Sequence, residues 1–198
     1  MFVTFEGIDW SGKSTQAKLL AAWLTEQGRT VLSTREPGGT PVAEAVRDLV
    51  LHRDEMTPWA EAALYAAARA ENVDAVIRPA LARGDDVVCD RYLDSSVAYQ
   101  GAGRGLGIER VRDLSLLVTG GLLPDRTILV AVDPEVASAR AGKQHDRIER
   151  AGGEFMRVVA DAYRSLAAAE PGRIIVVDGA RPPREIAEEV CEHVRPLL

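Results

Sequence analysis

The sequence predicts an α/β fold in three layers, in which helices cover both faces of a five-stranded parallel sheet. Short apolar runs recur along the chain, and their apolarity is continuous rather than alternating, which is typical of strands buried on both faces. Segments with the apolar spacing of helices separate these runs. At 198 residues, the chain has the length of one compact domain. We therefore expect residues 1–198 to form a single domain without an internal linker.

A glycine-rich motif follows the first apolar run. Phe2–Phe5 form that run, Gly7–Ser14 match the pattern G-x-x-x-x-G-K-[ST], and helical spacing begins at Lys13. A strand, a glycine turn and a helix in this order let backbone N–H groups surround a phosphate at the helix N-terminus. The chain is therefore predicted to bind a nucleoside triphosphate and to have the P-loop NTPase fold. An accidental glycine turn is the alternative, and the flanking strand and helix disfavour it.

The residues of this P-loop have distinct expected roles. Gly7 and Gly12 let the backbone turn tightly against the anion. Lys13 is expected to reach the β- and γ-phosphates of ATP, and the Ser14 hydroxyl is expected to bind Mg²⁺. The predicted triphosphate site consists of Gly7, Ile8, Asp9, Trp10, Ser11, Gly12, Lys13, Ser14 and Thr15.

The next segments add a strand, a loop and a helix. The second strand begins at Val31 and leads into the loop Thr34–Thr40, which contains a proline and two adjacent glycines. In doubly wound sheets, ligands bind at this edge, beyond the C-terminal ends of the strands. A helix is then expected over Val42 to Leu51.

Proline and glycine mark the limits of a longer helix. Thr57 is expected to cap it, with Pro58 at the favoured first position. Pro79 is expected to kink the helix, because proline lacks an N–H group and its ring crowds the preceding turn. Gly84 is the expected end.

Three further apolar runs complete the predicted sheet, at Val87–Cys89, Ile128–Val132 and Ile174–Val177. The first of them delivers Asp90-Arg91-Tyr92 to the edge where ligands bind. Four glycines then punctuate the chain, at Gly101, Gly103, Gly105 and Gly107. Helices are expected over Val111–Thr119, from Pro134, up to about Ala169, and through Ile186, Val190 and Val194.

Composition limits the partners of the chain. The net charge of −6 argues against a broad nucleic-acid interface, so phosphate-binding arginines must be concentrated locally. Cys89 and Cys191 lack metal-ligand spacing, and we expect them to be reduced packing residues in a cytoplasmic protein. No apolar run has the length of a membrane span, and strand residues begin at Met1, which leaves no room for a signal peptide.

Cations outside the P-loop indicate the kind of phosphate chemistry. The sequence has no N-K-x-D motif, which argues against a GTPase. Arg35, Arg69 and Arg91 lie near strand ends or on the long helix and form a second group of anion-binding side chains. A protein that only hydrolyses ATP needs no second phosphate pocket, whereas a kinase for a small phosphorylated acceptor requires one.

Four segments of the chain resemble bacterial thymidylate kinase: Phe5–Thr15, Thr34–Thr40, Asp90–Gly101 and Asp146–Glu149. The resemblance extends from Met1 to the last helix, in order and at matching spacings. Its T-R-E-P-G-G-T and D-R-Y…A-Y-Q-G pieces are far more specific than the P-loop. It implies a nucleoside monophosphate kinase that transfers a phosphoryl group from Mg-ATP to dTMP, giving dTDP and ADP and supplying dTTP for DNA synthesis.

The resemblance also implies roles at the acceptor phosphate and the metal ion. Arg91 and Arg35 would hold the dTMP phosphate, which a guanidinium suits better than a lysine. Asp90 would bind Mg²⁺ together with the P-loop serine. Asp9 would meet the sugar and phosphate end of the acceptor. The alternatives are a surface ion pair of Arg91 with Asp94, a helix-capping role for Asp90 and a loop-stabilising role for Asp9.

The base and sugar of the acceptor are assigned by the same resemblance. Tyr65 would stack on the thymine ring, although helix packing is the ordinary interpretation of its position. Arg69, one turn further along, would reach the thymine carbonyl edge. Tyr99 would crowd the 2′ position of the sugar. The polar side chains that could bind the remaining edge of the base are Ser95, Ser96 and Gln100. The implied dTMP site comprises Asp9, Arg35, Pro37, Tyr65, Arg69, Arg91, Ser95, Ser96, Tyr99 and Gln100.

A basic segment at about residues 140–150 resembles the lid of this family. The transferring phosphoryl group carries negative charge that a cation must meet in the transition state. One branch of the family has this arginine in the P-loop, at the position of Trp10, so the chain resembles the branch with a lid arginine. Gly142 stands where related lids often carry arginine, and a solvated loop is the alternative interpretation of the segment. We expect Arg147 to be the lid cation that meets the phosphoryl group, with Arg140 as the second choice. The predicted catalytic set is therefore Lys13, Arg91, Arg147, Arg140 and Asp9.

Two other functions remain open from the sequence. The first is a kinase for another nucleotide or nucleoside, such as dUMP, CMP or a deoxynucleoside, and Arg91 with Arg35 favours an acceptor that already bears a phosphate. The second is a non-catalytic nucleotide-binding domain, which the sparse lid would suit. The resemblance further suggests a homodimer.

Overall fold

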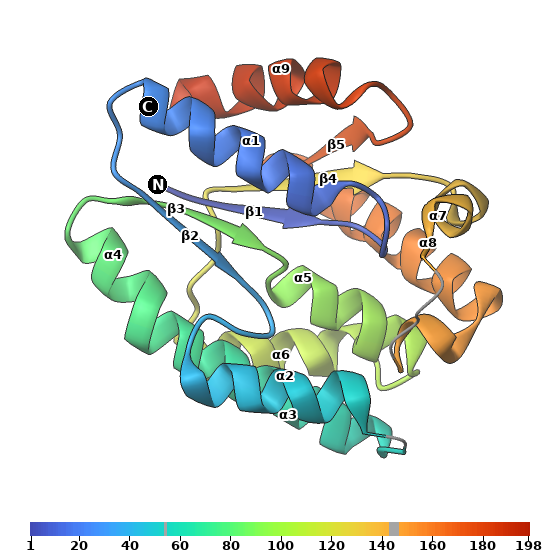
Figure 1. Cartoon of the computed structure of the whole chain (residues 1–198). Helices are drawn as coiled ribbons and strands as arrows, with labels where there is room; N and C mark the ends of the chain where they lie inside the picture. The colour runs from blue at the N-terminus through green and yellow to red at the C-terminus, as the bar shows by residue number, and fades with distance from the viewer. Residues whose placement is uncertain (54, 143–146) are drawn as a thin grey trace.

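The structure is a computed structural model that describes residues 1–53, 55–142 and 147–198. Within these residues, five strands form a sheet in the order β2-β3-β1-β4-β5 (Figure 1). Their bounds are β1 Phe2–Glu6, β2 Val31–Arg35, β3 Asp86–Asp90, β4 Arg126–Ala131 and β5 Ile174–Asp178. All four strand pairings are parallel. The predicted five-stranded parallel sheet is therefore confirmed.

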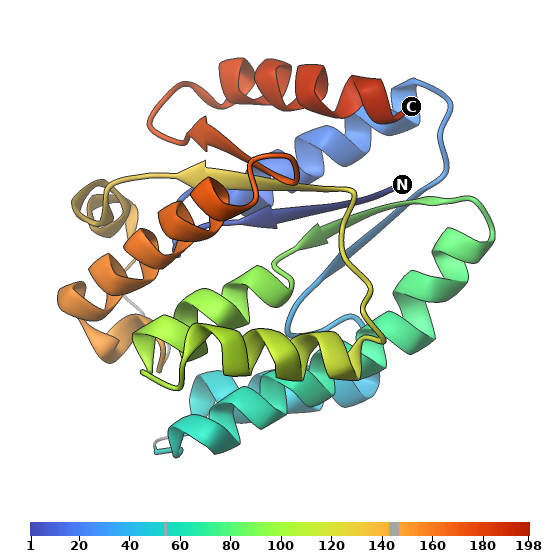
Figure 2. The same ribbon diagram turned by 180° about the vertical axis from the view of Figure 1, so that it is seen from behind.

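Helices cover both faces of this sheet, as Figures 1 and 2 show from opposite sides. One face carries α1 (Lys13–Glu26) and α9 (Pro183–Val194), which also contact each other. The opposite face carries α4 (Arg78–Ala82), α5 (Leu93–Ser96) and α8 (Gly153–Ala169), and α6 (Ile108–Val118) packs on α5 and α3. The remaining elements are α2 (Pro41–His52), which packs on α3 (Pro58–Asn72), the short α7 (Pro134–Arg140), and 3₁₀ turns at Glu149–Ala151 and Arg195–Leu197.

The central strand β1 is buried along its whole length. Because successive side chains of a strand point to opposite faces, Val3 and Phe5 pack with Leu20 of α1, whereas Phe2 packs in the cluster below the other face. β1 lies between β3 and β4. The chain adds β2 and β3 on one side of β1, and then β4 and β5 on its other side. The end of β1 is thus the switch point of the sheet, where ligands bind in open α/β folds.

The long helix is interrupted near its predicted kink. A π-helical turn, η1 (Val73–Ile77), separates α3 from α4, and Pro79 lies at the start of α4. The wider turn accommodates the proline ring, which would otherwise meet the carbonyl group one turn earlier. Arg83 caps the C-terminus of α4 and Gly84 follows with φ +85°. The helix thus ends next to the glycine that was expected to end it.

Two segments are more regular than the sequence suggests. The second strand continues to Arg35, so the loop begins at Glu36. The region that the four glycines punctuate is helical as far as Gly103, through α5 and a π-helical segment, η2 (Val97–Gly103). The turn is made by Gly105 and Gly107, which both have positive φ. Tertiary packing has overridden the low helix propensity of glycine at residues 101 and 103.

None of the described helices is both long and apolar enough to cross a membrane. Cys89 is buried in the core and Cys191 is partly buried, and both are free thiols.

Candidate active site

The P-loop joins the end of β1 to the start of α1. Gly7 has φ +140° and Gly12 has φ +99°, values that a residue with a side chain rarely adopts. A Cβ atom at Gly7 would also lie 2.6 Å from the carbonyl oxygen of Val130, so no other residue fits there. Trp10, between the two glycines, has φ +63° and an exposed indole. The backbone therefore has the geometry that the motif predicts.

Lys13 is the first residue of α1, and its side chain is enclosed by the loop. The residue is 7% exposed, and its Nζ atom lies 3.4 Å from the carbonyl oxygen of Ile8 and 3.8 Å from Asp9 Oδ1. Burial and the nearby Arg91 lower the pKa of Lys13, against the opposing effect of the carboxylates around it. Its ammonium group is thus held inside the glycine-rich loop, beside Ile8 and Asp9.

Ser14 and Asp90 form the predicted pair for a metal ion. The Ser14 hydroxyl donates a hydrogen bond to Asp90 Oδ2. Asp90 Oδ1 is buried and has no hydrogen-bond partner among the residues that the structure describes. A hydroxyl and a carboxylate oxygen are ligands that Mg²⁺ accepts, and the unsatisfied oxygen fits a cation there. The alternative, a helix-capping role for Asp90, is not seen, since α5 begins after Tyr92 without a side-chain cap.

Arg91 joins the P-loop to the opposite wall of the site. Its Nη1 donates to the carbonyl oxygen of Gly7 at 3.0 Å and to Ser95 Oγ at 3.1 Å, and its Nη2 donates to Asp9 Oδ1 at 2.5 Å. Arg91 has φ +72°, a strained value for a residue with a side chain. The alternative of an ion pair with Asp94 is wrong, because Asp94 pairs with Arg173 at 2.7 Å.

Asp9 receives hydrogen bonds from two directions. Besides Arg91, the hydroxyl of Tyr99 donates to Asp9 Oδ2 at 3.0 Å. Burial raises the pKa of this carboxyl, but the charges of Arg91 and Lys13 outweigh burial and hold the pKa below its ordinary value. Asp9 is therefore an anion between two cations, one from the P-loop helix and one from the end of β3.

Glu6 was not predicted from the sequence, although it supports this arrangement from below. Its carboxyl accepts hydrogen bonds from the backbone N–H of Tyr92 at 2.7 Å, from the hydroxyl of Ser95 at 2.5 Å and from that of Tyr163 at 2.7 Å. Burial and the charge of Asp94 raise the pKa of Glu6 to about 7. An acid at the end of an otherwise apolar strand was the available signal.

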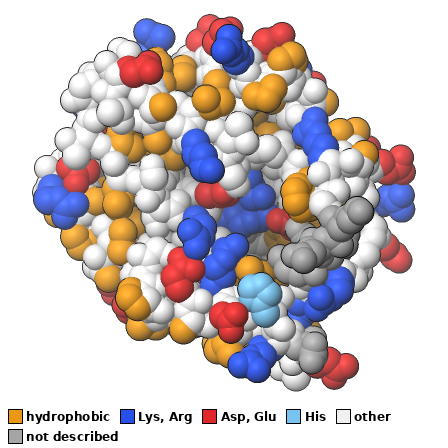
Figure 3. All heavy atoms as spheres, viewed as in Figure 1, with side chains coloured by type: hydrophobic (Ala, Val, Ile, Leu, Met, Phe, Trp, Pro, Cys, Tyr) orange, Lys and Arg blue, Asp and Glu red, His pale blue; other side chains and the backbone are white. Residues whose placement is uncertain are grey.

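A cleft opens beside Arg91, and Figure 3 shows Lys and Arg side chains gathered around a hollow on this face. Its lining consists of Glu36, Pro37, Arg47, Leu51, Tyr65, Arg69, Arg91, Ser95, Ser96, Tyr99, Gln100 and Ile148. Most of the predicted acceptor residues are thus brought together. Arg47 of α2 is the cation that the sequence analysis missed, and its Nη1 donates to the carbonyl oxygen of Pro37 at 3.0 Å.

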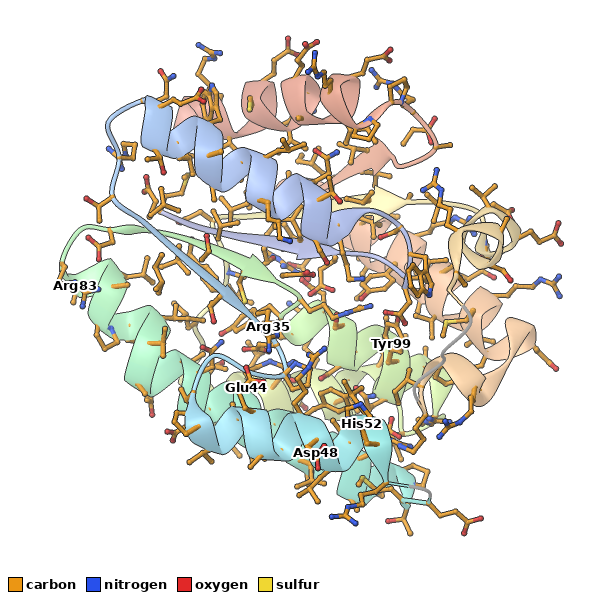
Figure 4. All side chains as sticks on the ribbon, viewed as in Figure 1. Arg35, Glu44, Asp48, His52, Arg83 and Tyr99 are labelled. Carbon is orange, nitrogen blue, oxygen red and sulfur yellow. The ribbon has the colours of Figure 1, made fainter. Side chains whose placement is uncertain are left out.

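Arg35 does not line this cleft. It is largely exposed and pairs with Glu44 at 2.9 Å, in a separate groove with Ser14 and Asp90, and Figure 4 shows the two side chains together. The reason is strand alternation: β2 reaches Arg35, so Arg35 and Glu36 point in opposite directions, and Glu36 takes the inward one. The prediction that Arg35 faces the acceptor phosphate is corrected in this respect.

Arg69 is held tightly by the protein. It is 1% exposed and donates from Nε to Glu36, from Nη1 to Ser115, and twice from Nη2, to the carbonyl oxygen of Tyr92 and to Ser96 Oγ. Of the five N–H groups of a guanidinium, one on Nη1 remains without a partner among the described residues. Ser96 therefore positions Arg69, just as Ser95 positions Arg91.

Tyr99 and Tyr65, the two tyrosines of the predicted dTMP site, both line the cleft. The Tyr99 ring is buried and packs edge-on against Phe155 and Tyr163. Gln100, also buried, donates from Nε2 to Glu61 Oε1 at 2.8 Å.

The two predicted lid arginines point to different parts of the molecule. Arg147 donates from Nη1 to Glu61 Oε2 at 2.7 Å and from Nε to the carbonyl oxygen of Val50 at 2.9 Å. Arg140 donates to the carbonyl oxygen of Gly179 at 3.1 Å, after β5. Neither contacts Lys13 or Arg91 in the described part of the chain. Residues 143–146 of the predicted lid, including Lys143, His145 and Asp146, lie outside the described residues.

Comparisons with known proteins agree on one family. A family model described as thymidylate kinase matches residues 5–190. The thymidylate kinase of Leifsonia xyli subsp. xyli is 55% identical over 194 residues, covering 96% of this chain and 92% of that protein. That of Synechococcus sp. (strain JA-3-3Ab) is 50% identical over 198 residues, covering 100% and 97%. The crystal structure of thymidylate kinase from Ehrlichia chaffeensis superposes with a TM-score of 0.82 at 34% identity and covers 98% of each chain.

Proposed function

The chain belongs to the thymidylate kinase family and phosphorylates dTMP to dTDP with ATP, and we propose the roles by which its residues perform this transfer. The observation that carries the proposal is Arg91, which binds Asp9 of the P-loop and also lines the cleft. A phosphate in the cleft and a triphosphate in the P-loop would therefore meet at this arginine. Positioning and charge are what phosphoryl transfer mainly requires.

On the donor side, residues 7–15 bind the triphosphate, and Lys13 neutralises the β- and γ-phosphates. Ser14 and Asp90 would hold Mg²⁺, which is supported by the unsatisfied Oδ1 of Asp90. The ion would supply positive charge that offsets the negative charge of the phosphate oxygens, so that the anionic acceptor can approach them. On the acceptor side, Arg91 and Arg47 bind the dTMP phosphate.

The base occupies the far end of the cleft. Tyr65 and Pro37 bound the thymine ring, the remaining N–H of Arg69 reads a carbonyl oxygen, and Gln100 reads the neighbouring edge. This proposal is supported by their common place in the cleft lining. An ADP-release assay tests the function as a whole, with dTMP, dUMP, CMP and deoxythymidine as acceptors. Equal rates with all four, or none with dTMP, would refute it.

Replacing Tyr99 by alanine is expected to let the ribose form of TMP act as a substrate, because the ring fills the space that a 2′-hydroxyl needs. The relevant measurement is kcat/KM for dTMP and for the ribose form. The structure adds a cost: the ring packs on two aromatic neighbours and its hydroxyl binds Asp9. We therefore expect a loss of about 3–5 kcal/mol in the free energy of unfolding as well.

Tyr99→Phe is the matched control for this change. It keeps the ring and removes only the hydroxyl, so discrimination against ribose should persist while the Asp9 contact is lost. A Tyr99→Ala enzyme that rejects the ribose form as strongly as the wild type would mean that the sugar is recognised elsewhere.

A lid arginine is proposed to meet the transferring group, with Arg147 first and Arg140 second. Arg147→Ala is expected to lower kcat at least tenfold or so with little change in the KM for ATP, since a transition-state contact contributes little to ground-state binding. Some rise in the KM for dTMP is expected too, because the variant also loses the contact with Glu61. Steady-state kinetics with each substrate varied in turn gives these constants.

Arg157→Ala provides the control, because Arg157 is an exposed arginine paired with Glu135 at 3.3 Å. If Arg147→Ala, Arg140→Ala and the double variant all keep the wild-type kcat, no lid arginine takes part in the chemical step.

Two broader features are also proposed. A homodimer is suggested by the family resemblance and is consistent with exposed apolar side chains at Val42, Leu49, Trp59 and Leu117. A cytoplasmic location suits an enzyme of nucleotide metabolism and two free cysteines. Neither substrate is a nucleic acid or a membrane lipid.

A further inference from the structure

Glu61 is a buried carboxylate that has been given no role of its own so far. It lies in the first turn of α3 and is 1% exposed. Three side chains from separate segments donate to it: Gln100 Nε2 at 2.8 Å and Arg104 Nε at 3.2 Å to Oε1, and Arg147 Nη1 at 2.7 Å to Oε2. Two guanidinium groups compensate its charge, so burial of the carboxylate is tolerated.

The contact with Glu61 determines which way round the Gln100 amide lies. A carboxylate offers acceptors only, so the amide atom beside it must be the NH₂ group and not the carbonyl oxygen. Gln100 is 2% exposed and lines the cleft. Its Oε1 has no hydrogen-bond partner within the described ranges. The side chain is therefore held with its acceptor available to a ligand in the cleft.

An acceptor at this position distinguishes between pyrimidines. Thymine and uracil carry a hydrogen on N3, which donates to a carbonyl oxygen, whereas cytosine has an unprotonated N3 that would face that oxygen with a lone pair. A buried polar group left without its partner costs more than a satisfied pair gains. The same site would thus accept one class of base and reject the other.

We propose that Glu61 is a positioning residue for base selection, which holds Gln100 as an acceptor so that the cleft binds pyrimidines with an N3–H group and disfavours cytosine. This inference rests on the proposed function, in which Gln100 reads the base edge. Glu61 itself touches no substrate. Arg104 and Arg147 keep the carboxylate in place and so keep the amide from turning over.

Glu61→Gln tests the inference, because a glutamine at this position accepts or donates with equal ease and no longer dictates the orientation of Gln100. The ratio of kcat/KM for dTMP to that for dCMP is expected to fall about tenfold, the usual value of one misplaced hydrogen bond. The ratio of dTMP to dUMP should stay unchanged, since both bases present the same N3–H group. Thermal unfolding of each variant reports its stability separately.

Gln100→Met distinguishes a positioning role from a structural one. It removes the amide at similar volume and should lower the dTMP-to-dCMP ratio by itself. Adding Glu61→Gln to Gln100→Met should then leave this ratio unchanged, even if stability falls further. An unchanged ratio in either single variant overturns the inference. If Glu61→Gln does not fold, the ratio in Gln100→Met alone decides.

The wild-type enzyme separates this outcome from failure of the proposed function. If the wild type does not prefer dTMP to the other acceptors, the proposed function itself is refuted. If it does prefer dTMP and the variants keep its full preference over dCMP, only the role of Glu61 is refuted.

Discussion

Replacing Lys13 by alanine is expected to lower kcat by about 10²- to 10³-fold, the loss typical of a charged or hydrogen-bonding group aimed at a developing anion. Lys13 is enclosed by the P-loop, so no solvent cation takes its place readily. The fold should persist, because the side chain contributes no apolar packing to the core and alanine is compatible with the first turn of a helix. Turnover at saturating ATP and dTMP, together with the melting temperature, gives both quantities.

Arg184→Ala supplies a matched control for the lost charge. Arg184 lies on α9 and is exposed, so its removal changes the net charge equally without touching the loop. Lys13→Ala with an unchanged melting temperature and near-normal turnover would remove Lys13 from the triphosphate site.

The fold was predictable because its signals are local. Continuous apolar strands imply burial on both faces, and the parallel sheet follows from it. The backbone of the P-loop was predictable in detail, because its turn needs positive φ values at residues 7 and 12, and the sequence has glycine at both. The helical structure through Gly101 and Gly103 was not predicted, since it depends on packing against α6 and α8, which propensity does not report.

A residue of the site could be predicted only where a motif or the resemblance identified it without knowledge of its partners. Arg91, Tyr65 and Tyr99 follow from motif and resemblance, and all three line the cleft. Glu6 and Glu61 were missed because their partners are far away in the chain: Tyr163 is 157 residues from Glu6, and Arg147 is 86 residues from Glu61. No local pattern encodes such a pairing.

Two arginines also show that local sequence does not determine which side chains reach the cleft. Arg35 has the right residue type beside the right strand, but a strand longer than expected turns its side chain outward. Arg47 lies in the middle of a helix, where an arginine is usually a solvated surface residue, and only the packing of α2 on α3 brings it to the cleft.

The electrostatics of the site depend on one carboxylate between two cations. Asp9 pairs with Arg91 at 2.5 Å and lies 3.8 Å from Lys13. These cations lower the pKa of Asp9, so the anion is present throughout the physiological range. Asp9 thus keeps two like charges close together before any phosphate arrives. Removal of either cation leaves Asp9 facing a phosphate with less compensation.

Replacing Arg91 by alanine is expected to raise the KM for dTMP roughly a hundredfold, with less than about a threefold change in the KM for ATP. A lost bidentate, charge-assisted contact costs about 2–3 kcal/mol, which gives this factor. The structure adds a second penalty on the acceptor side, because Asp9 would lose its closest partner and repel the incoming phosphate. Isothermal titration with dTMP and separately with ATP measures both affinities directly.

Arg83→Ala is the matched control, since Arg83 also pairs with an aspartate, Asp85, at 2.8 Å, but lies far from Tyr99 and the cleft (Figure 4). Adding Asp9→Asn to Arg91→Ala separates the two penalties: dTMP affinity should recover in part, because the unpaired charge is removed while the lost phosphate contact is not. If ATP affinity falls as far as dTMP affinity in Arg91→Ala, Arg91 serves the donor site as much as the acceptor. Its assignment to the dTMP phosphate would then be wrong.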